Sequence, residues 1–186
     1  MIGYAFCGSY CTHQKALSAM EALIREGHQI QPIMSENVYQ TDTRFGTAEQ
    51  LKARLRDLCN CEIIHSIVDA EPLGPALHLD AMIISPCTGN TLAKIANGIT
   101  DTAVCMAAKA HIRSDRPLII ALATNDALSA NLRNIGVLLN RKNLYFVPMI
   151  QDDPREKPHS LVANFDKISE TLHLALKGKQ MRKLFE

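Results

Sequence analysis

The stretch Ala81–Ile99, AMIISPCTGNTLAKIANGI, decides the fold because a strand, a polar turn and a helix follow one another in it. The first four residues are apolar and have the length of a buried strand. Residues 92–99 have the sequence of a helix, and between the two lie one proline, one glycine and small hydroxyl or amide side chains. This order predicts one strand–turn–helix unit of an α/β protein.

The same alternation of strand and helix extends along the whole chain. Strands are predicted at residues 2–6, 28–35, 62–68, 80–85, 117–124 and 143–149. Helices are predicted at residues 15–27, 48–58, 92–109, 127–139 and 161–178, with a short helix or turn at 71–79. Strands joined by helices of this length require right-handed crossovers. We therefore expect one domain, residues 1–186, with a doubly wound, mostly parallel sheet and helices on both faces.

The composition narrows the classes of function. The chain has 186 residues, 47% of them hydrophobic, and a formal net charge of +1, so it is expected to be a soluble globular protein without electrostatic attraction to nucleic acid or membranes. Its longest apolar runs have strand length and cannot cross a bilayer. The first residues, MIGYAFCGS, have no basic segment, so we expect no signal peptide and a cytoplasmic location.

The six cysteines do not have the spacing of a zinc site. Cys7 and Cys11 form C-x-x-x-C, and Cys59 and Cys61 form C-x-C, without a histidine cluster to complete either pair. We therefore expect reduced thiols and no bound metal. Cys87, in the polar turn, is either a small buried residue or a thiol activated at a helix start.

Polar loops are expected to meet at the carboxyl edge of the sheet, where ligands bind in doubly wound folds. These loops are CGSYCTH, SENV, SPCTGNT and TNDALSANL. Helix N-termini attract phosphate, although the same residue types also serve as simple helix caps. A P-loop is excluded because Ser9 stands where the lysine should be, and the first strand is not followed by G-x-G-x-x-G. A mononucleotide such as FMN remains.

The segment SPCTGNTLAKIANGITDT resembles the P-A-S-A-N-T…K-I-A-x-G-I-x-D signature of the flavin-dependent cysteine decarboxylase-like flavoproteins. The resemblance implies FMN bound by Gly8, Ser9, Ser35, Ser85, Pro86, Thr88, Gly89, Asn90 and Thr91. It also implies catalytic roles for Asn90 and Asn125, and a homo-oligomer built from trimers.

The chain departs from the decarboxylases of this family at their catalytic histidine. Pro72 stands at the expected position, and His65 and His78 are the nearby alternatives. The second decarboxylase motif is reduced to ATNDAL, which keeps Asn125 but not the methionine and tryptophan. Flavin prenyltransferases are disfavoured because TN replaces their Arg-Glu pair. Decarboxylation of a cysteinyl substrate is therefore the second interpretation.

The C-terminal segment QDDPREKPHSLVA is similar to one branch of the family, the B subunits of a two-subunit synthase of sporulating bacteria. This implies a dehydrogenase-like A subunit that carries NADP, and the formation of pyridine-2,6-dicarboxylate from a dihydro-type precursor. Because the substrate is a small dicarboxylate, Arg155, Lys157 and His159 are expected either to bind it or to contact the A subunit. A merely solvated loop, and a B subunit that is only structural, are the alternatives.

Overall fold

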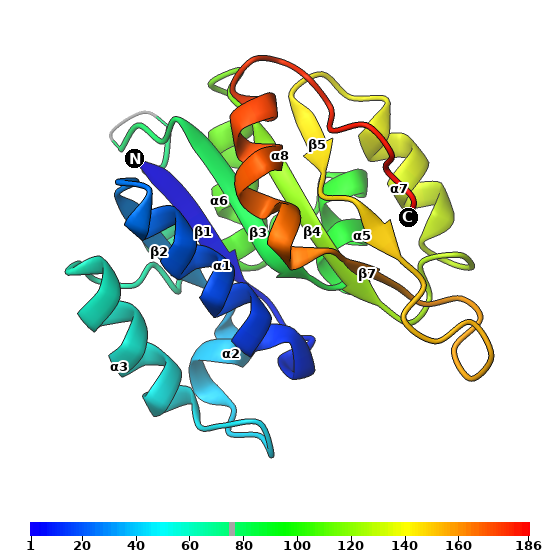
Figure 1. Cartoon of the computed structure of the whole chain (residues 1–186). Helices are drawn as coiled ribbons and strands as arrows, with labels where there is room; N and C mark the ends of the chain where they lie inside the picture. Colours follow the sequence, from blue (N-terminus) through cyan, green and yellow to red (C-terminus); the bar gives the residue numbers. More distant parts are fainter. Residues whose placement is uncertain (75–76) are drawn as a thin grey trace.

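A seven-stranded sheet forms the centre of the molecule (Figure 1). The computed structural model describes residues 1–74 and 77–186. The strands are β1 Ile2–Phe6, β2 Ile30–Met34, β3 Ala81–Cys87, β4 Leu118–Thr124, β5 Leu144–Phe146, β6 Met149–Ile150 and β7 Leu161–Ala163. The order β2-β1-β3-β4 is parallel, and β5 also pairs with β4 in parallel. The predicted α/β fold with a mostly parallel sheet is confirmed.

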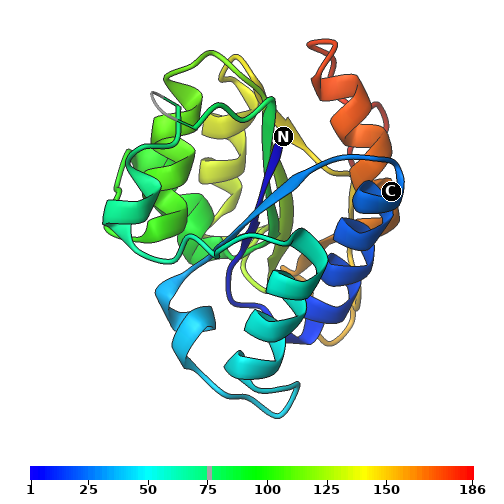
Figure 2. The same cartoon turned by 90° about the vertical axis from the view of Figure 1, so that its left-hand side faces the viewer.

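Helices cover both faces of the sheet (Figure 2). One face packs against α1 His13–Arg25, α3 Ala48–Cys59 and α8 Ile168–Ala175. The other packs against α4 Ile67–Ala70, α5 Gly89–Asn97, α6 Ala103–Ile112 and α7 Leu132–Leu139. The structure also contains three short helices: η1 Tyr10–Thr12, α2 Glu36–Gln40 and η2 Phe165–Lys167. Because both faces are covered, β1 to β4 are almost wholly buried, as their continuous apolar sequences predict.

The prediction of a strand at residues 62–68 is wrong, because these residues form one bridge and the start of a helix. Only Ile64 contributes, through an isolated bridge to Ile33 at the edge of the sheet. Ser66 then accepts a hydrogen bond from the Asp69 N–H at 3.1 Å and begins α4. This N-cap starts a helical turn in a sequence whose apolar residues suit a strand equally well.

The single helix predicted at residues 92–109 is two helices, α5 and α6. Gly98 ends α5 in the left-handed region, at φ 73°. Thr102 caps α6 by accepting a hydrogen bond from the Cys105 N–H at 3.2 Å. A left-handed glycine followed by a threonine cap stops one helix and starts another, whatever the helix propensity of the flanking residues. Two further boundaries differ from the prediction: β3 continues to Cys87 instead of ending at residue 85, and α7 begins at Leu132 instead of residue 127.

The C-terminal part departs most from the prediction. The strand predicted at 143–149 is divided into β5 and β6, and the helix predicted from Leu161 begins only at Ile168. Leu161 lies in β7, which pairs antiparallel with the end of β4 through Thr124. β5 pairs only with the first half of β4, so the second half of the same edge accepts β7.

Two smaller findings complete the description. Residues 71–74 of the predicted segment 71–79 form a turn, and residues 75–76 lie outside the described part of the chain. Among the described residues, no helix is long and apolar enough to cross a membrane.

Candidate functional site

The loops that follow β1, β2, β3 and β4 lie at one edge of the sheet, as the sequence predicts. We call this edge the rim. The Cys7 N–H donates to the Pro86 carbonyl at 3.3 Å, which joins the first loop to β3. The Ser9 hydroxyl donates to the Ala123 carbonyl at 2.7 Å, which joins it to β4. The Ser35 N–H donates to the Phe6 carbonyl at 2.9 Å, so one network connects all four strand ends.

The loop after β1 turns sharply at the rim. Ser9 is in the left-handed region at φ 62°, an uncommon conformation for a residue other than glycine. Gly8 lies close to the loop after β3, because a Cβ atom on it would be 3.2 Å from Thr88 Cγ2. The hydroxyl hydrogen of Ser9 is engaged by Ala123, so the backbone rather than this side chain remains available to a ligand.

The loop after β3 leads directly into α5. Thr88 caps this helix, since its hydroxyl accepts a hydrogen bond from the Thr91 N–H at 3.2 Å. The first amides of a helix have no carbonyl partner within it, so the Gly89 and Asn90 N–H groups start α5 without one. The Asn90 side chain is exposed at this point. Ser35 has the same role at α2, where it accepts from the Val38 N–H at 3.4 Å.

Ser85 and Pro86 differ from the other predicted ligand residues because both are buried within β3. The Ser85 side chain has no exposed surface and lies beside the Tyr4 hydroxyl, whose pKa is raised by burial and partly lowered again by this neighbour. The two residues therefore lie beneath the rim rather than on it.

A carboxylate organises the loop after β4. Asp126 Oδ1 accepts hydrogen bonds from Thr124 Oγ1 at 2.6 Å and from Asn131 Nδ2 at 2.9 Å. These hydrogen bonds, that of Thr124 first, hold the pKa of Asp126 below its usual value. Gly89 packs against this group, since a Cβ atom on it would lie 2.8 Å from Asp126 Oδ1. Asn125 precedes Asp126 and is exposed, so α5 and the loop present Asn90 and Asn125 on the same rim.

The loop of residues 151–160 adjoins the rim beside β4. The His159 carbonyl of this loop accepts a hydrogen bond from the Leu128 N–H at 2.9 Å. The loop then leads into β7, which pairs with the end of β4 at Thr124. Arg155, Lys157 and His159 are all exposed. Lys157 pairs with Asp152 at 3.1 Å, which leaves part of its charge compensated.

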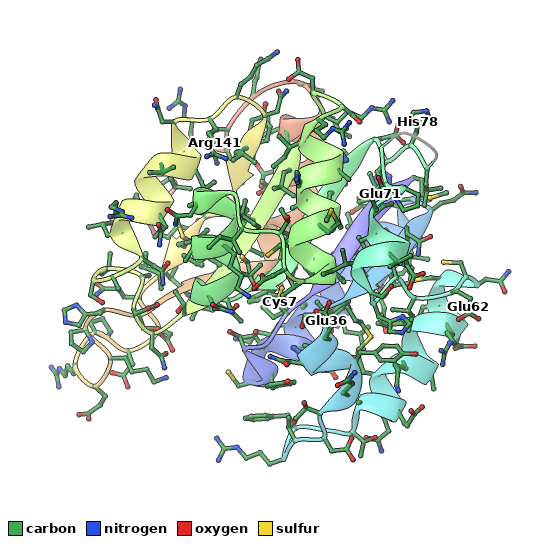
Figure 3. All side chains as sticks on the ribbon, turned by 180° about the vertical axis from the view of Figure 1, so that it is seen from behind. Cys7, Glu36, Glu62, Glu71, His78 and Arg141 are labelled. Carbon is green, nitrogen blue, oxygen red and sulfur yellow. The ribbon has the colours of Figure 1, made fainter. Side chains whose placement is uncertain are left out.

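Three side chains at the rim were not identified from the sequence as candidate site residues. His13 begins α1, and its Nε2 lies 2.7 Å from the Cys7 carbonyl. Burial lowers the pKa of His13, which favours the neutral imidazole. Glu36 accepts from the Ala103 N–H at 2.8 Å and so joins α2 to α6 (Figure 3). Asp126 is the third. His13 stands in the quoted segment CGSYCTH, so its position after β1 was the available signal.

The other candidate groups are placed less favourably. Burial raises the pKa of Cys87 well above its ordinary value, which favours its interpretation as a buried filler. His78 precedes β3, at the edge where the strands begin, and lies well apart from Cys7, which follows β1 (Figure 3). His65 stacks on Tyr39 with ring centroids 3.8 Å apart.

A hollow of about 510 Å³ opens beside the first loop. Tyr10, His13 and Val38 border it on the side of the rim, and Phe45 and Arg54 lie on the side of α3. Its lining is about equally polar and apolar, which suits a ligand that combines a ring with polar groups.

Comparisons with known proteins agree with this geometry. The family model "Flavoprotein" matches residues 1–173. The B subunit of dipicolinate synthase from Bacillus subtilis (strain 168) is 45% identical over 181 residues, which are 97% of this chain and 90% of that protein. The crystal structure of the dipicolinate synthase B subunit from Bacillus halodurans C is 40% identical, with a TM-score of 0.91 over 100% of this chain and 95% of that one.

A more distant structure shares the fold alone. The FMN-dependent cysteine decarboxylase SpaF is 23% identical, with a TM-score of 0.64 over 94% of this chain and 95% of that one. The resemblance of the segment after β3 to flavoproteins, and of the C-terminal segment to the B-subunit branch, is confirmed by the nearer relatives. The chain belongs to the flavoprotein family.

Proposed function

We propose that the chain is an FMN-binding B subunit of dipicolinate synthase, which acts with a dehydrogenase-like A subunit in the cytoplasm of a sporulating cell. The observation that carries the proposal is the 45% identity to the B subunit of the Bacillus subtilis synthase over 97% of the chain. The reaction would be a two-electron oxidation of the dihydro-type precursor, which loses two hydrogens to give pyridine-2,6-dicarboxylate. NADP is assigned to the A subunit.

The donor set at the rim fits the phosphate of FMN. The first amides of α5 start without a carbonyl partner, and within the described residues no backbone hydrogen bond occupies the N–H groups of Gly8 and Ser9 on the neighbouring loop. Helix N-termini favour anions. The hydroxyls of Ser9, Ser35 and Thr88 are engaged within the chain. We therefore assign the binding to backbone N–H groups, with the hydroxyls and the buried Ser85 and Pro86 holding the loops in place. Thr91 supports the same turn from inside the helix.

When bound, the flavin would supply a two-electron acceptor. The contribution of the chain would be to hold the substrate and to limit access of water. Asn90 and Asn125 donate and accept hydrogen bonds but carry no charge, so they would position the substrate rather than act as strong acids. Neutral His13, at the end of the first loop with its Nε2 against the Cys7 carbonyl, is a candidate proton acceptor. Arg155, Lys157 and His159 would face the dicarboxylate or the A subunit.

A second function is favoured by one observation. The side-chain oxygens of Ser35 and Thr88 are occupied as helix caps, as they would be in a B subunit without flavin that only stabilises the complex. Decarboxylation of a cysteinyl substrate is the third candidate, and Pro72 at the position of the catalytic histidine disfavours it.

Titration of the purified chain with FMN and with riboflavin, alone and with its A subunit, tests the proposal. Saturable FMN binding is expected, with riboflavin at least about tenfold weaker because hydrogen bonds to a charged group contribute about 1.5–3 kcal/mol. Dipicolinate formation should then depend on added FMN. Product formation without flavin, and without FMN binding in either state, would contradict the redox role and support the structural one.

A further inference from the structure

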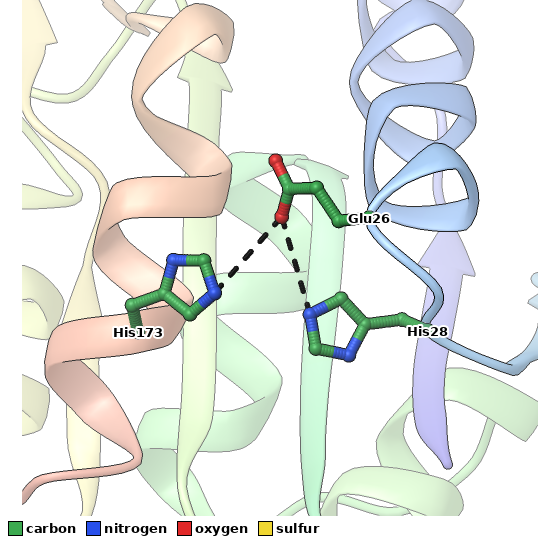
Figure 4. Close-up of side chains that lie close together, drawn as sticks. All are labelled: Glu26, His28 and His173. Atoms are coloured by element: carbon green, nitrogen blue, oxygen red, sulfur yellow. Dashed lines mark ion pairs between the residues drawn. The ribbon is translucent and has the colours of Figure 1, made fainter.

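A group of three potential metal ligands lies far from the rim, at the edge where the strands begin (Figure 4). Glu26 follows the last turn of α1, His28 precedes β2, and His173 lies in the last turn of α8. They come from segments almost 150 positions apart in the chain, so no ligand spacing in the sequence reveals them. The expectation that no metal binds rested on the cysteine spacing and on the lack of a histidine cluster in the sequence.

The end of α1 brings the first two ligands together. The His28 N–H donates to the Leu23 carbonyl at 3.1 Å, and the Gly27 N–H donates to the Ile24 carbonyl at 2.9 Å. These two hydrogen bonds, with Gly27 in the left-handed region at φ 91°, form a Schellman motif. The motif reverses the chain after Glu26, so the backbone fixes the approach of His28 to the carboxylate.

The three ligand atoms already lie near one another. Glu26 Oε2 is 4.0 Å from His28 Nε2 and 4.0 Å from His173 Nε2, and all three atoms lie within 4.8 Å of one another. Ligands about 2.0–2.1 Å from a tetrahedral zinc ion are about 3.4 Å apart. The required movement of the side chains is therefore about 1 Å. The half-exposed side chain of His173 and the partly exposed one of Glu26 leave room for it.

A fourth residue orients the carboxylate. Ser169 Oγ lies 2.8 Å from both Oε1 and Oε2 of Glu26, and it stands one helical turn before His173 on α8. Residues that hydrogen-bond to a metal-ligating group in this way fix its direction and commonly change metal affinity by about 10- to 100-fold.

We propose that Glu26, His28 and His173 bind a divalent transition-metal ion of the Zn²⁺ class, with Ser169 orienting Glu26 and solvent completing the coordination. Two imidazoles and one carboxylate are a common ligand set for zinc. The ion would join the end of α1 to the last turn of α8 and so stabilise the packing of the C-terminal helix. An ion pair between Glu26 and protonated histidines is the competing explanation.

The test is a titration of the untagged full chain with Zn²⁺ against a chromophoric chelator, with no flavin present. Because thiolates also bind zinc, the measurement uses a background with Cys59→Ser and Cys61→Ser. One equivalent of zinc is expected. His173→Ala and His28→Ala should each weaken binding by at least about tenfold, and Ser169→Ala should weaken it while leaving all three ligands in place. His78→Ala, an exposed histidine outside the group, is the matched control and should bind like the parent.

Thermal unfolding gives a second measurement. Zinc should raise the melting temperature of the parent and of His78→Ala but not that of His173→Ala, because a ligand stabilises only the state that binds it. Equal zinc affinity in the parent and in both histidine variants would overturn the proposal, as would the absence of binding at millimolar zinc. Either result is independent of the FMN titration.

Discussion

At the scale of single residues, the close packing of Gly89 decides how two loops of the site fit together. A Cβ atom at this position would lie 2.5 Å from Asn131 Nδ2 and 2.6 Å from Thr124 Oγ1. The resembling family signature has alanine here, whereas in this chain Asn131 and Thr124, the side chains that bind Asp126, lie where its methyl group would be. The start of α5 and the loop that carries Asn125 are consequently in direct contact.

Gly89→Ala should therefore displace the loop after β4. We expect a loss of about 1–3 kcal/mol in the free energy of unfolding, typical of overpacking, and weaker FMN binding. Gly136→Ala is the matched control, since it also lies in a helix but has no atom within 4 Å of an added Cβ. That variant should gain about 0.5–1 kcal/mol because alanine favours a helix. Urea unfolding and FMN titration of both variants check the prediction, and equal behaviour of the two would contradict it.

At the scale of elements, the loop of residues 151–160 carries the candidate cations Arg155 and Lys157 beside the rim, together with three acidic residues, Asp152, Asp153 and Glu156. It is held to the rim by the hydrogen bond from Leu128 to His159 and by the pairing of β7 with β4. Its position follows from the antiparallel extension of the sheet, which places residues distant in sequence from Asn125 beside it.

Arg155→Ala with Lys157→Ala should raise the apparent KM for the dicarboxylate substrate by roughly two- to thirtyfold, since two exposed charge pairs contribute about 0.2–1 kcal/mol each. Lys142→Ala, a cation at the far end of the sheet paired with Asp115, is the control. Steady-state kinetics with the A subunit, at two salt concentrations, measure the effect. Unchanged KM together with unchanged assembly would leave the loop as a solvated surface.

At the scale of the whole molecule, two histidines, the half-buried His13 and the buried His111, couple stability to pH. His13 lies against the Cys7 carbonyl, and His111 Nε2 lies 2.8 Å from the Pro117 carbonyl. Burial is the largest influence on both and lowers the pKa of each. Below about pH 6.5 the unfolded chain therefore binds protons that the folded chain does not, which destabilises the fold as the pH falls.

The free energy of unfolding should fall from about pH 6.5 towards each folded pKa, by at most about 1.4 kcal/mol per pH unit for each histidine. The variant His13→Gln with His111→Gln keeps a hydrogen-bond donor at both positions and should show a flatter dependence. His78→Gln, at an exposed position, should retain the slope of the parent. Urea unfolding between pH 7 and pH 5 provides the measurement, and identical slopes in all three proteins would contradict the assignment.

The sequence alone determined the fold class, the four central strands and the edge at which the polar loops meet. It did so because continuous apolar strands, helical periodicity and strand-end loops are local patterns that a doubly wound sheet uses in one way. It also identified the flavoprotein family, because Pro86, Asn90, Thr91 and the residues after them keep a specific order.

Only the tertiary structure decided which residues face the rim and which lie beneath it. Ser85 belongs to the same motif as Asn90, yet it is buried, because β3 continues three residues beyond its apolar run, through Ser85 to Cys87. Gly89 packs against Asp126 from another element, and Glu26, His28 and His173 come together from separate segments of the chain. Burial, hydrogen bonding and ligand geometry depend on contacts between distant segments, and a pattern within one segment does not contain them.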